Sequence, residues 1–406
     1  MKCRHCANEL HASCLDLGTA PPSNSYLSLE QLSEPELYFP LRLLFCDQCY
    51  LVQTEDFTRR ELLFSEDYAY FSSYSSSWLE HARKYVSAVC ERFALDQESL
   101  VVEVAANDGY LLQYVQQRNI PCLGIEPTES TAQAARAKGI RVESVFFGVA
   151  SARELAGRGL QADLMVANNV LAHVPDINDF VAGFAVLLKE NGVVTFEFPH
   201  LLNLVRFNQF DTVYHEHFSY LSLSAVQNIF SANGLNVFDV EELSTHGGSL
   251  RVYAQKSYVQ PLADSVERVL ELERSAGIHT AHFYQDFQAA AEGVKNALIR
   301  YLIDCKSQGL KVAAYGAAAK GNTLLNFAGI RHDLLSFVVD KNPQKQTRFL
   351  PGSRIRIEKP EAIEMERPDR VLILPWNLEN EICDEMAFIR SWGAKFVLAV
   401  PHLREI

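Results

Sequence analysis

The segment Tyr214–His217, which reads YHEH, gathers four side chains that handle protons. A histidine can remove a proton from a carbon that an adjacent ketone makes acidic, while a glutamate orients the ring and a tyrosine stabilises the enolate oxygen. A zinc protease site needs two histidines four residues apart on a helix. His215 and His217 are two apart, and on a strand they would share a face with Glu216 opposite. We therefore favour acid–base catalysis; histidines satisfied within a polar loop are the alternative.

Four of the nine cysteines stand in two CxxC pairs, Cys3 with Cys6 and Cys46 with Cys49. Two such pairs complete a tetrahedral thiolate shell with no open position, so we expect a structural zinc site. A region of about sixty residues buries little core, and a bound metal adds folding energy. The wide gap between the pairs leaves His11 or Cys14 as possible substitutes for one ligand.

Residues 101–109 read VVEVAANDG, which indicates a buried strand followed by a turn of small and polar residues. Small side chains at the carboxyl end of a strand let a ligand approach the backbone. The next predicted strand ends at Glu126, whose carboxylate can accept both ribose hydroxyls of a nucleoside. The turn is not GxGxxG and lacks the glycines that seat a diphosphate. An ordinary parallel strand with a polar turn is the alternative.

A second junction between strand and helix reads GAAAKGNT over residues 316–323. Free amides at a helix start, together with a lysine, can bind a diphosphate, whereas a packing turn is the alternative. The loop does not match a Walker motif, so ATP hydrolysis is not expected. The candidates for substrate binding here are Lys320, Asn322, Thr323 and Arg348, with Lys345 as a further phosphate candidate.

Two α/β rhythms must position these residues, one from residue 100 and one from residue 311. Apolar strands that alternate with helices predict parallel, doubly wound sheets, in which ligands bind at the carboxyl ends of the strands. Asn168, Asn169 and His173 follow one such strand, so we expect them near YHEH. The stretch 262–306 reads as helical. We predict an α/β chain with three domains: a four-cysteine zinc-binding domain (1–65), a Rossmann-like central domain (66–265) and a second Rossmann-like domain (266–406).

Composition excludes several classes of protein. The 406 residues are 48% hydrophobic and 21% charged, which is typical of a globular chain with more than one domain. The net charge of −13 argues against a nucleic-acid partner. No stretch approaches the roughly 20 apolar residues of a membrane span, and the N-terminus lacks the apolar core of a signal peptide. We expect a cytoplasmic monomer without a membrane or nucleic-acid partner.

The EVAANDG turn resembles motif I of class I S-adenosylmethionine (SAM) methyltransferases, whose cofactor carries no phosphate. A longer ordered set of motifs resembles the sugar C-methyltransferases that act on nucleotide-linked 4-ketosugars, such as the dTDP-sugar 3-C-methyltransferases. The set spans nearly the whole chain: CxxC…CxxC, YAYFSS, EVAANDG, NNVLAHVPD, FEFPH, YHEHFSYLS, GGSLRVY, YGAAAKGNTLLN and DKNPQKQTRFLPGSRI.

The resemblance implies a SAM-dependent methyltransferase domain at 66–265 and a C-terminal domain that helps to hold the sugar nucleotide. It implies methyl transfer to C3 of a 4-keto-deoxysugar, which is dTDP-linked in the family, through an enolate. His217 looks like the general base, with Glu216 and Tyr214 as its neighbours and Tyr68 or Tyr70 as a further active-site tyrosine. Substrate contacts would include Asn169, His173 and His215. Cofactor contacts would be Glu103, Ala105, Asn107, Asp108, Gly109, Glu126, Phe146 and Asn168.

Two other methyltransferase classes remain as alternatives. A sugar O-methyltransferase could also use a histidine base, but it would accept a 4-hydroxy sugar. A zinc-containing RNA methyltransferase is disfavoured by the net charge and by NNVLAH, which stands where an amino-methylating enzyme would carry an NPPY-like motif. A non-catalytic zinc scaffold would leave the acid–base cluster unexplained.

Overall fold

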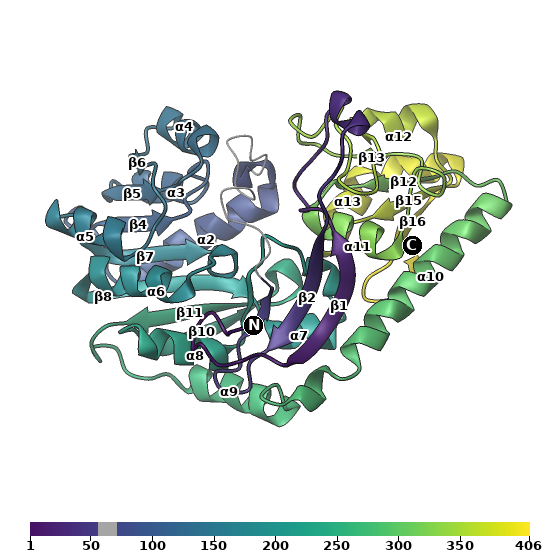
Figure 1. Ribbon diagram of the computed structural model, residues 1–406. Coiled ribbons are helices and arrows are strands. Elements are labelled where there is room, and N and C mark those ends of the chain that lie inside the picture. Colours follow the sequence, from purple (N-terminus) through teal and green to yellow (C-terminus); the bar gives the residue numbers. More distant parts are fainter. Residues whose placement is uncertain (56–70) are drawn as a thin grey trace.

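The computed structural model describes residues 1–55 and 71–406, so the predicted tyrosines Tyr68 and Tyr70 lie outside the described residues. In this part of the chain the strands form three sheets, and the predicted α/β class is confirmed (Figure 1). We call residues 76–276 the central unit and residues 287–406 the C-terminal unit. The domain boundaries after residues 65 and 265 stay a prediction.

The N-terminal sheet has the order β1-β2-β3-β9 and is antiparallel. Its last strand comes from the central unit, directly after YHEH, so this sheet holds the histidine segment from one side. A short 3₁₀ helix, η1 (Glu30–Ser33), lies between its first two strands. The strands are β1 (Ala12–Ala20), β2 (Phe39–Phe45), β3 (Val52–Thr54) and β9 (Ser219–Tyr220).

The central sheet has the order β10-β11-β8-β7-β4-β5-β6. The five strands from β8 to β6 are parallel, and β11 and β10 add an antiparallel edge. Apolar runs produce the buried strands: VVEV forms β4, and all four of its residues are buried. The strands are β4 (Val101–Val104), β5 (Cys122–Ile125), β6 (Val142–Glu143), β7 (Ala162–Asn168), β8 (Leu188–Pro199), β10 (Asn236–Leu243) and β11 (Ser249–Gln255).

Three helices of the central unit, α2, α6 and α8, begin at side-chain caps. Ser75 caps α2 by accepting from the Trp78 amide, and Asp176 caps α6 by accepting from the Asp179 amide. The helices are α2 (Ser76–Arg92), α3 (Leu112–Gln116), α4 (Glu129–Ala137), α5 (Val149–Gly157), α6 (Ile177–Leu187), α7 (Leu201–Arg206), α8 (Leu223–Ala232) and α9 (Asp264–Ala276). The 3₁₀ helix η2 (Ser72–Tyr74) precedes this unit, and η3 (Leu171–His173), η4 (Phe210–Thr212) and η5 (Thr245–Gly247) lie within it.

The C-terminal sheet has the order β14-β13-β12-β15-β16-β17 and is parallel except for β17. Its strands are β12 (Val312–Tyr315), β13 (Val338–Val339), β14 (Ile357–Glu358), β15 (Arg370–Ile373), β16 (Lys395–Leu398) and β17 (Arg404–Glu405). Its helices are α10 (Phe287–Ser307), α11 (Ala319–Ala328), α12 (Glu361–Glu366) and α13 (Glu379–Glu385), with the 3₁₀ helices η7 (Trp376–Leu378) and η8 (Ala387–Trp392).

The stretch 262–306 is not one continuous helix. Helix α9 ends at Gly277, which takes the left-handed conformation (φ +81°) that favours glycine. The 3₁₀ helix η6 (Ala281–Tyr284) and then α10 follow. The apolar pattern alone did not reveal this break.

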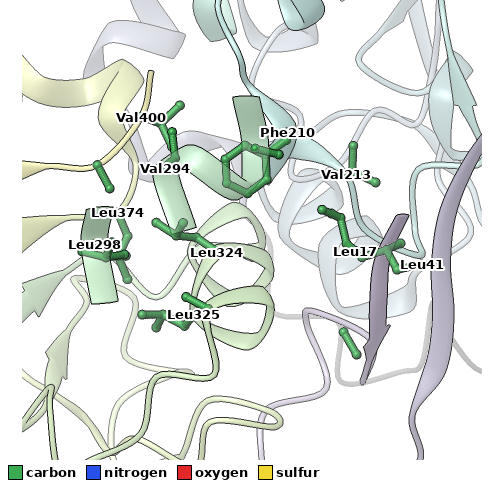
Figure 2. Close-up of a cluster of buried hydrophobic side chains, with 14 of the residues drawn as sticks. Leu17, Leu41, Phe210, Val213, Val294, Leu298, Leu324, Leu325, Leu374 and Val400 are labelled. Atoms are coloured by element: carbon green, nitrogen blue, oxygen red, sulfur yellow. The ribbon is translucent and has the colours of Figure 1, made fainter. Parts of the chain in front are cut away.

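One hydrophobic cluster joins the N-terminal sheet, the segment before YHEH and the C-terminal unit (Figure 2). Strands β1 and β2 stand between the two larger units in Figure 1, and α10 and α11 pack against β1. Because the cluster crosses all three parts, its burial fixes their relative positions. Its members include Leu17, Leu41, Phe210, Val213, Leu298, Leu324 and Val400.

Candidate active site and metal centre

A tight turn, not a strand, carries YHEH. The His217 amide donates to the Tyr214 carbonyl at 2.9 Å, which brings their rings together with centroids 3.9 Å apart. The Tyr214 hydroxyl lies 2.7 Å from Nε2 of His217, and Nδ1 lies 3.0 Å from the Thr212 carbonyl. Because a carbonyl only accepts, Nδ1 carries the proton and Nε2 accepts from the tyrosine. The expectation that His215 would share a face with His217 is wrong, because the turn separates them.

His173 joins this pair from the loop after β7. Its Nδ1 donates to the Glu216 carbonyl at 2.8 Å, and its ring centroid lies 4.5 Å from that of His217. Burial lowers the pKa of His173 to about 4 and holds the pKa of His217 well below its usual value. Both imidazoles are therefore neutral at pH 7, and each can accept a proton.

His215 and Glu216 face the N-terminal sheet. Nε2 of His215 lies 3.2 Å from the carbonyls of Phe39 and Pro40. Oε1 of Glu216 accepts from the backbone amide and the side chain of Asn24, at 3.1 and 3.2 Å. Glu216 is 1% exposed, and burial raises the pKa of its carboxyl group. These contacts hold the turn in place, and they direct both side chains away from the Tyr214–His217 pair.

A buried ionic network that the sequence analysis missed lies beside His246. Glu197 on β8 lies 2.9 Å from Nε2 of His81 and accepts from Arg251 at 3.0 Å. Burial alone would raise the pKa of Glu197, but His81 and Arg251 bring it below its ordinary value. Trp78 stacks on His81 and lies 5.2 Å from the ring of His246. A lone carboxylate within the apolar stretch VVTFEF was the available signal, because it needs a cationic partner.

Asn168 ends β7, and Asn169 follows it directly. Asn169 takes a left-handed conformation (φ +53°), and its Nδ2 lies 3.4 Å from Nε2 of His246. Both polar atoms of the buried Asn168 side chain lack a protein partner, as does Oδ1 of the buried Asp108. Buried polar atoms normally have partners, so these atoms fit a polar ligand at the end of the sheet.

The EVAANDG turn folds tightly over the carboxyl ends of β4 and β5. Ala105, Asn107 and Gly109 all take left-handed conformations, with φ of +59°, +50° and +75°. The Ala105 amide donates to the Ile125 carbonyl at 2.8 Å. Non-glycine residues adopt this conformation at a cost, and such strain concentrates at ligand sites. Glu103, 1% exposed beneath the turn, has a pKa raised well above its usual value by burial.

Glu126 ends β5 and holds the turn. Its two carboxylate oxygens accept from the Asn107 and Thr128 amides, each at 2.9 Å. Each oxygen keeps a lone pair, so the carboxylate can still accept from ribose hydroxyls. Phe146, in the loop after β6, is 42% exposed and offers an apolar ring near this end of the sheet. The turn, Glu126 and Asn168 together fit the nucleoside and amino-acid parts of SAM.

The loop before α11 lies at the border with the central unit. Thr323 donates to the Val213 carbonyl at 2.8 Å, and Asn322 donates to the Ser23 carbonyl at 2.6 Å. These side chains therefore join the C-terminal unit to the rest of the protein. Lys320 instead contacts Asn377 and the ring of Trp376, whereas Arg348 is partly buried in the loop after β13.

The four predicted metal ligands form one cluster. Their Sγ atoms all lie within 4.8 Å of one another, and the Cys3–Cys49 and Cys6–Cys46 pairs are each 3.5 Å apart. A tetrahedral zinc ion with bonds of ~2.3 Å needs sulfur atoms roughly 3.8 Å apart, so the group fits zinc. Arg4, between the first two ligands, donates to the carbonyls of Pro175 and Thr54 at 3.0 and 3.1 Å. Through Arg4, the first CxxC pair is thereby hydrogen-bonded to the loop after His173.

Family models match the three parts of the chain. A "zinc binding domain" matches residues 3–64, a "methyltransferase domain" residues 78–240, and a "C-methyltransferase C-terminal domain" residues 244–401. Together with the strand order, the motif I turn and the thiol cluster, these matches define a SAM-dependent methyltransferase with a structural zinc site. SAM is its cofactor, as the sequence predicts.

A relative then specifies the family. C-methyltransferase NovU of Streptomyces niveus is 33% identical over 407 residues, covering 100% of this chain and 96% of that protein. The chain therefore belongs to the SAM-dependent C-methyltransferase family of this relative. Ubiquinone biosynthesis O-methyltransferase of Bartonella quintana (strain Toulouse) is 23% identical over 174 residues, covering 37% of this chain and 68% of that protein.

Among solved structures, magnesium protoporphyrin IX methyltransferase of Synechocystis PCC 6803 with bound SAM is similar at 16% identity and a TM-score of 0.32. The match covers 43% of this chain and 79% of that chain. Among the described residues, none of the helices has both the length and the apolar character to cross a membrane.

Proposed function

We propose that the enzyme methylates C3 of a nucleotide-linked 4-keto-deoxysugar, with His217 as the general base. The pairing of Tyr214 with His217 carries the proposal. The Thr212 carbonyl fixes the proton on Nδ1, so Nε2 keeps the lone pair that a base needs. Burial keeps this imidazole neutral at pH 7, because it holds the pKa well below its usual value.

The reaction begins when the C3–H bond breaks and its proton passes to Nε2 of His217. Because the Tyr214 hydroxyl contacts that nitrogen at 2.7 Å, the proton moves through the hydroxyl, or directly once the substrate displaces it. The electron pair of the bond delocalises onto the 4-oxygen as an enolate. When bound, SAM would supply the methyl group for C3 and leave as a neutral thioether, and the ketone would re-form. A 4-hydroxy sugar has no such acidic C3 proton, so the ketone is essential.

The remaining assignments belong to the same proposal. The sugar is dTDP-linked, and the enzyme is a cytoplasmic monomer divided after residues 65 and 265. Asn169 and His173 contact the sugar, and one of Tyr68 and Tyr70 enters the site. The cofactor contacts are Glu103, Ala105, Asn107, Asp108, Gly109, Glu126, Phe146 and Asn168.

Mass spectrometry tests the reaction with a panel of 4-keto and 4-hydroxy nucleotide sugars, incubated in heavy water with SAM. We expect one added methyl group, on carbon, with 4-keto sugars only. Deuterium at C3 without methylation would support the base and the enolate but identify that sugar as the wrong acceptor. Methylation of 4-hydroxy sugars or of RNA instead would overturn the proposal and favour the O-methyltransferase or RNA methyltransferase alternative.

A further inference from the structure

Lys320 is a buried cation at the junction of the two larger units, and its nearest charge partner is the carboxylate of Asp211. It lies in the first turn of α11, and its Nζ donates to Oδ1 of Asn377 at 2.7 Å. The ammonium group also sits 4.5 Å from the centre of the Trp376 ring. Among the residues that the structure describes, no carboxylate oxygen lies within 4 Å of Nζ. Burial lowers the pKa of Lys320 and Asp211 raises it, but no carboxylate contacts the ammonium group directly, so its remaining N–H groups can bind an anionic ligand.

The C-terminal unit directs this charge into the histidine cluster of the central unit. The loop with Trp376 touches the loop with His246 so closely that a Cβ on Gly247 would lie 2.4 Å from the indole. Nε1 of Trp376 donates to Oδ2 of Asp211 at 2.8 Å, which fixes the ring beneath the lysine. Lys320 is close enough to contribute to the lowered pKa values of both His217 and His246.

The positive charge of Lys320 favours one stage of the reaction and disfavours another. A cation near His217 makes that imidazole a weaker base, so it does not assist the resting enzyme. Once His217 has taken the proton, however, an enolate oxygen has formed on the substrate, and the cation then has a favourable partner. A group that stabilises charge only as it develops lowers the barrier of the step.

We infer that Lys320 is a catalytic residue whose ammonium group stabilises the 4-oxygen of the enolate, an inference that rests on the proposed function. In this step the C3–H electron pair becomes the C3–C4 double bond, the former carbonyl pair moves onto the oxygen, and the proton stays on His217. Lys320 forms a hydrogen bond to that oxygen and keeps its own protons. The competing role is the one that the loop sequence predicts, in which Lys320 holds the diphosphate of the substrate.

The two roles separate in an exchange experiment without methyl transfer. Wild-type enzyme, Lys320→Met and Lys320→Arg are incubated in heavy water with dTDP-4-keto-6-deoxyglucose and without SAM, and deuterium at C3 is followed by mass spectrometry. The affinity for dTDP alone is measured by calorimetry. Lys359→Met, at an exposed lysine of the same unit, is the matched control.

We expect exchange in Lys320→Met to fall by about 10²–10³-fold while the Kd for dTDP stays within about twofold, with Lys320→Arg recovering part of the rate. Unchanged exchange in Lys320→Met would overturn the inference. A parallel weakening of dTDP binding would overturn it in favour of the diphosphate role. If the wild-type enzyme itself exchanges no deuterium, the proposed enolate chemistry fails and the inference fails with it.

Discussion

The central and C-terminal units use one topology in two ways. Each places its first strand, β4 or β12, in the middle of a parallel sheet, with the next two strands on one side and the following two on the other. In each unit a carboxylate at the end of the second strand holds the loop after the first. Glu126 accepts from the Asn107 amide at 2.9 Å, and Asp340 accepts from the Ala317 amide at 2.8 Å.

The surroundings of these carboxylates differ. At the same edge of the central sheet as Glu126, the Asn168 side chain keeps two buried polar atoms without a protein partner. Near Asp340, protein groups fill the corresponding region: Lys345 lies 3.7 Å from the carboxylate, and the hydroxyl of Tyr26 donates to the Ala317 carbonyl at 2.6 Å. The same strand order thus supports a cofactor site beside the carboxylate in one unit and a packed loop beside it in the other. Side chains, not topology, decide which.

Substitution of His217 should have the largest effect, because it removes the proposed base from the central unit. We expect His217→Asn to lower kcat about 10³-fold, or about 4 kcal/mol, while the Kd for SAM stays within about twofold. Steady-state kinetics and calorimetry measure the two quantities. His332→Asn, at an exposed histidine of the C-terminal unit, should change neither. Near-normal turnover of His217→Asn would refute the assignment of the base.

Loss of the zinc ion should have the next largest effect, on stability, because the N-terminal sheet packs against both larger units. Cys46→Ser removes one of four ligands, so we expect the zinc content to fall well below one ion per chain. We also expect the free energy of unfolding to fall by about 3 kcal/mol. Elemental analysis and denaturant titration test this. Cys383→Ser, outside the cluster, should keep the metal, and full zinc occupancy in Cys46→Ser would contradict the four-thiolate site.

Features that depend on residues close together in the sequence could be predicted, and contacts between residues far apart in the sequence could not. The apolar run VVEV and the spacing of the cysteines are local, and they predicted β4 and the thiol cluster. The contact between Glu216 and Asn24 spans 192 residues and depends on how the units pack, which no local pattern encodes. The turn at Tyr214 lacks the glycine or proline that usually marks one, so its ring pairing could not be foreseen.

A matched pair of substitutions tests the difference between the two carboxylates directly. We expect Glu126→Gln to raise the Kd for SAM at least about 10-fold, because it weakens both the hold on the turn and the acceptor for the ribose. Asp340→Asn should leave that Kd within about twofold. Calorimetry with SAM measures both. Equal weakening in the two variants would mean that the C-terminal unit also binds the cofactor.

The pH dependence of kcat/KM tests the lowered pKa of His217, to which Lys320 of the C-terminal unit contributes. His217 acts in its neutral form, and burial, together with the neighbouring His173 and the Lys320 ammonium group, holds its pKa well below 6.5. Activity should therefore persist as pH falls from 8 to about 6 and decline only below the ordinary histidine value. An acid limb at pH 6.5 or above, in a range where the protein stays folded, would mean that another group is the base.

The smallest effect should come from substitution of Thr323. This substitution tests whether the loop before α11 has a structural role or binds the substrate. Its hydroxyl donates to the Val213 carbonyl at 2.8 Å and is buried. Thr323→Val should therefore lower the free energy of unfolding by about 1 kcal/mol and leave KM for the sugar nucleotide unchanged. Ser336→Ala, at an exposed hydroxyl of the same unit, should alter neither. A raised KM with an unchanged Tm would instead place Thr323 against the substrate, as the sequence of the loop predicts.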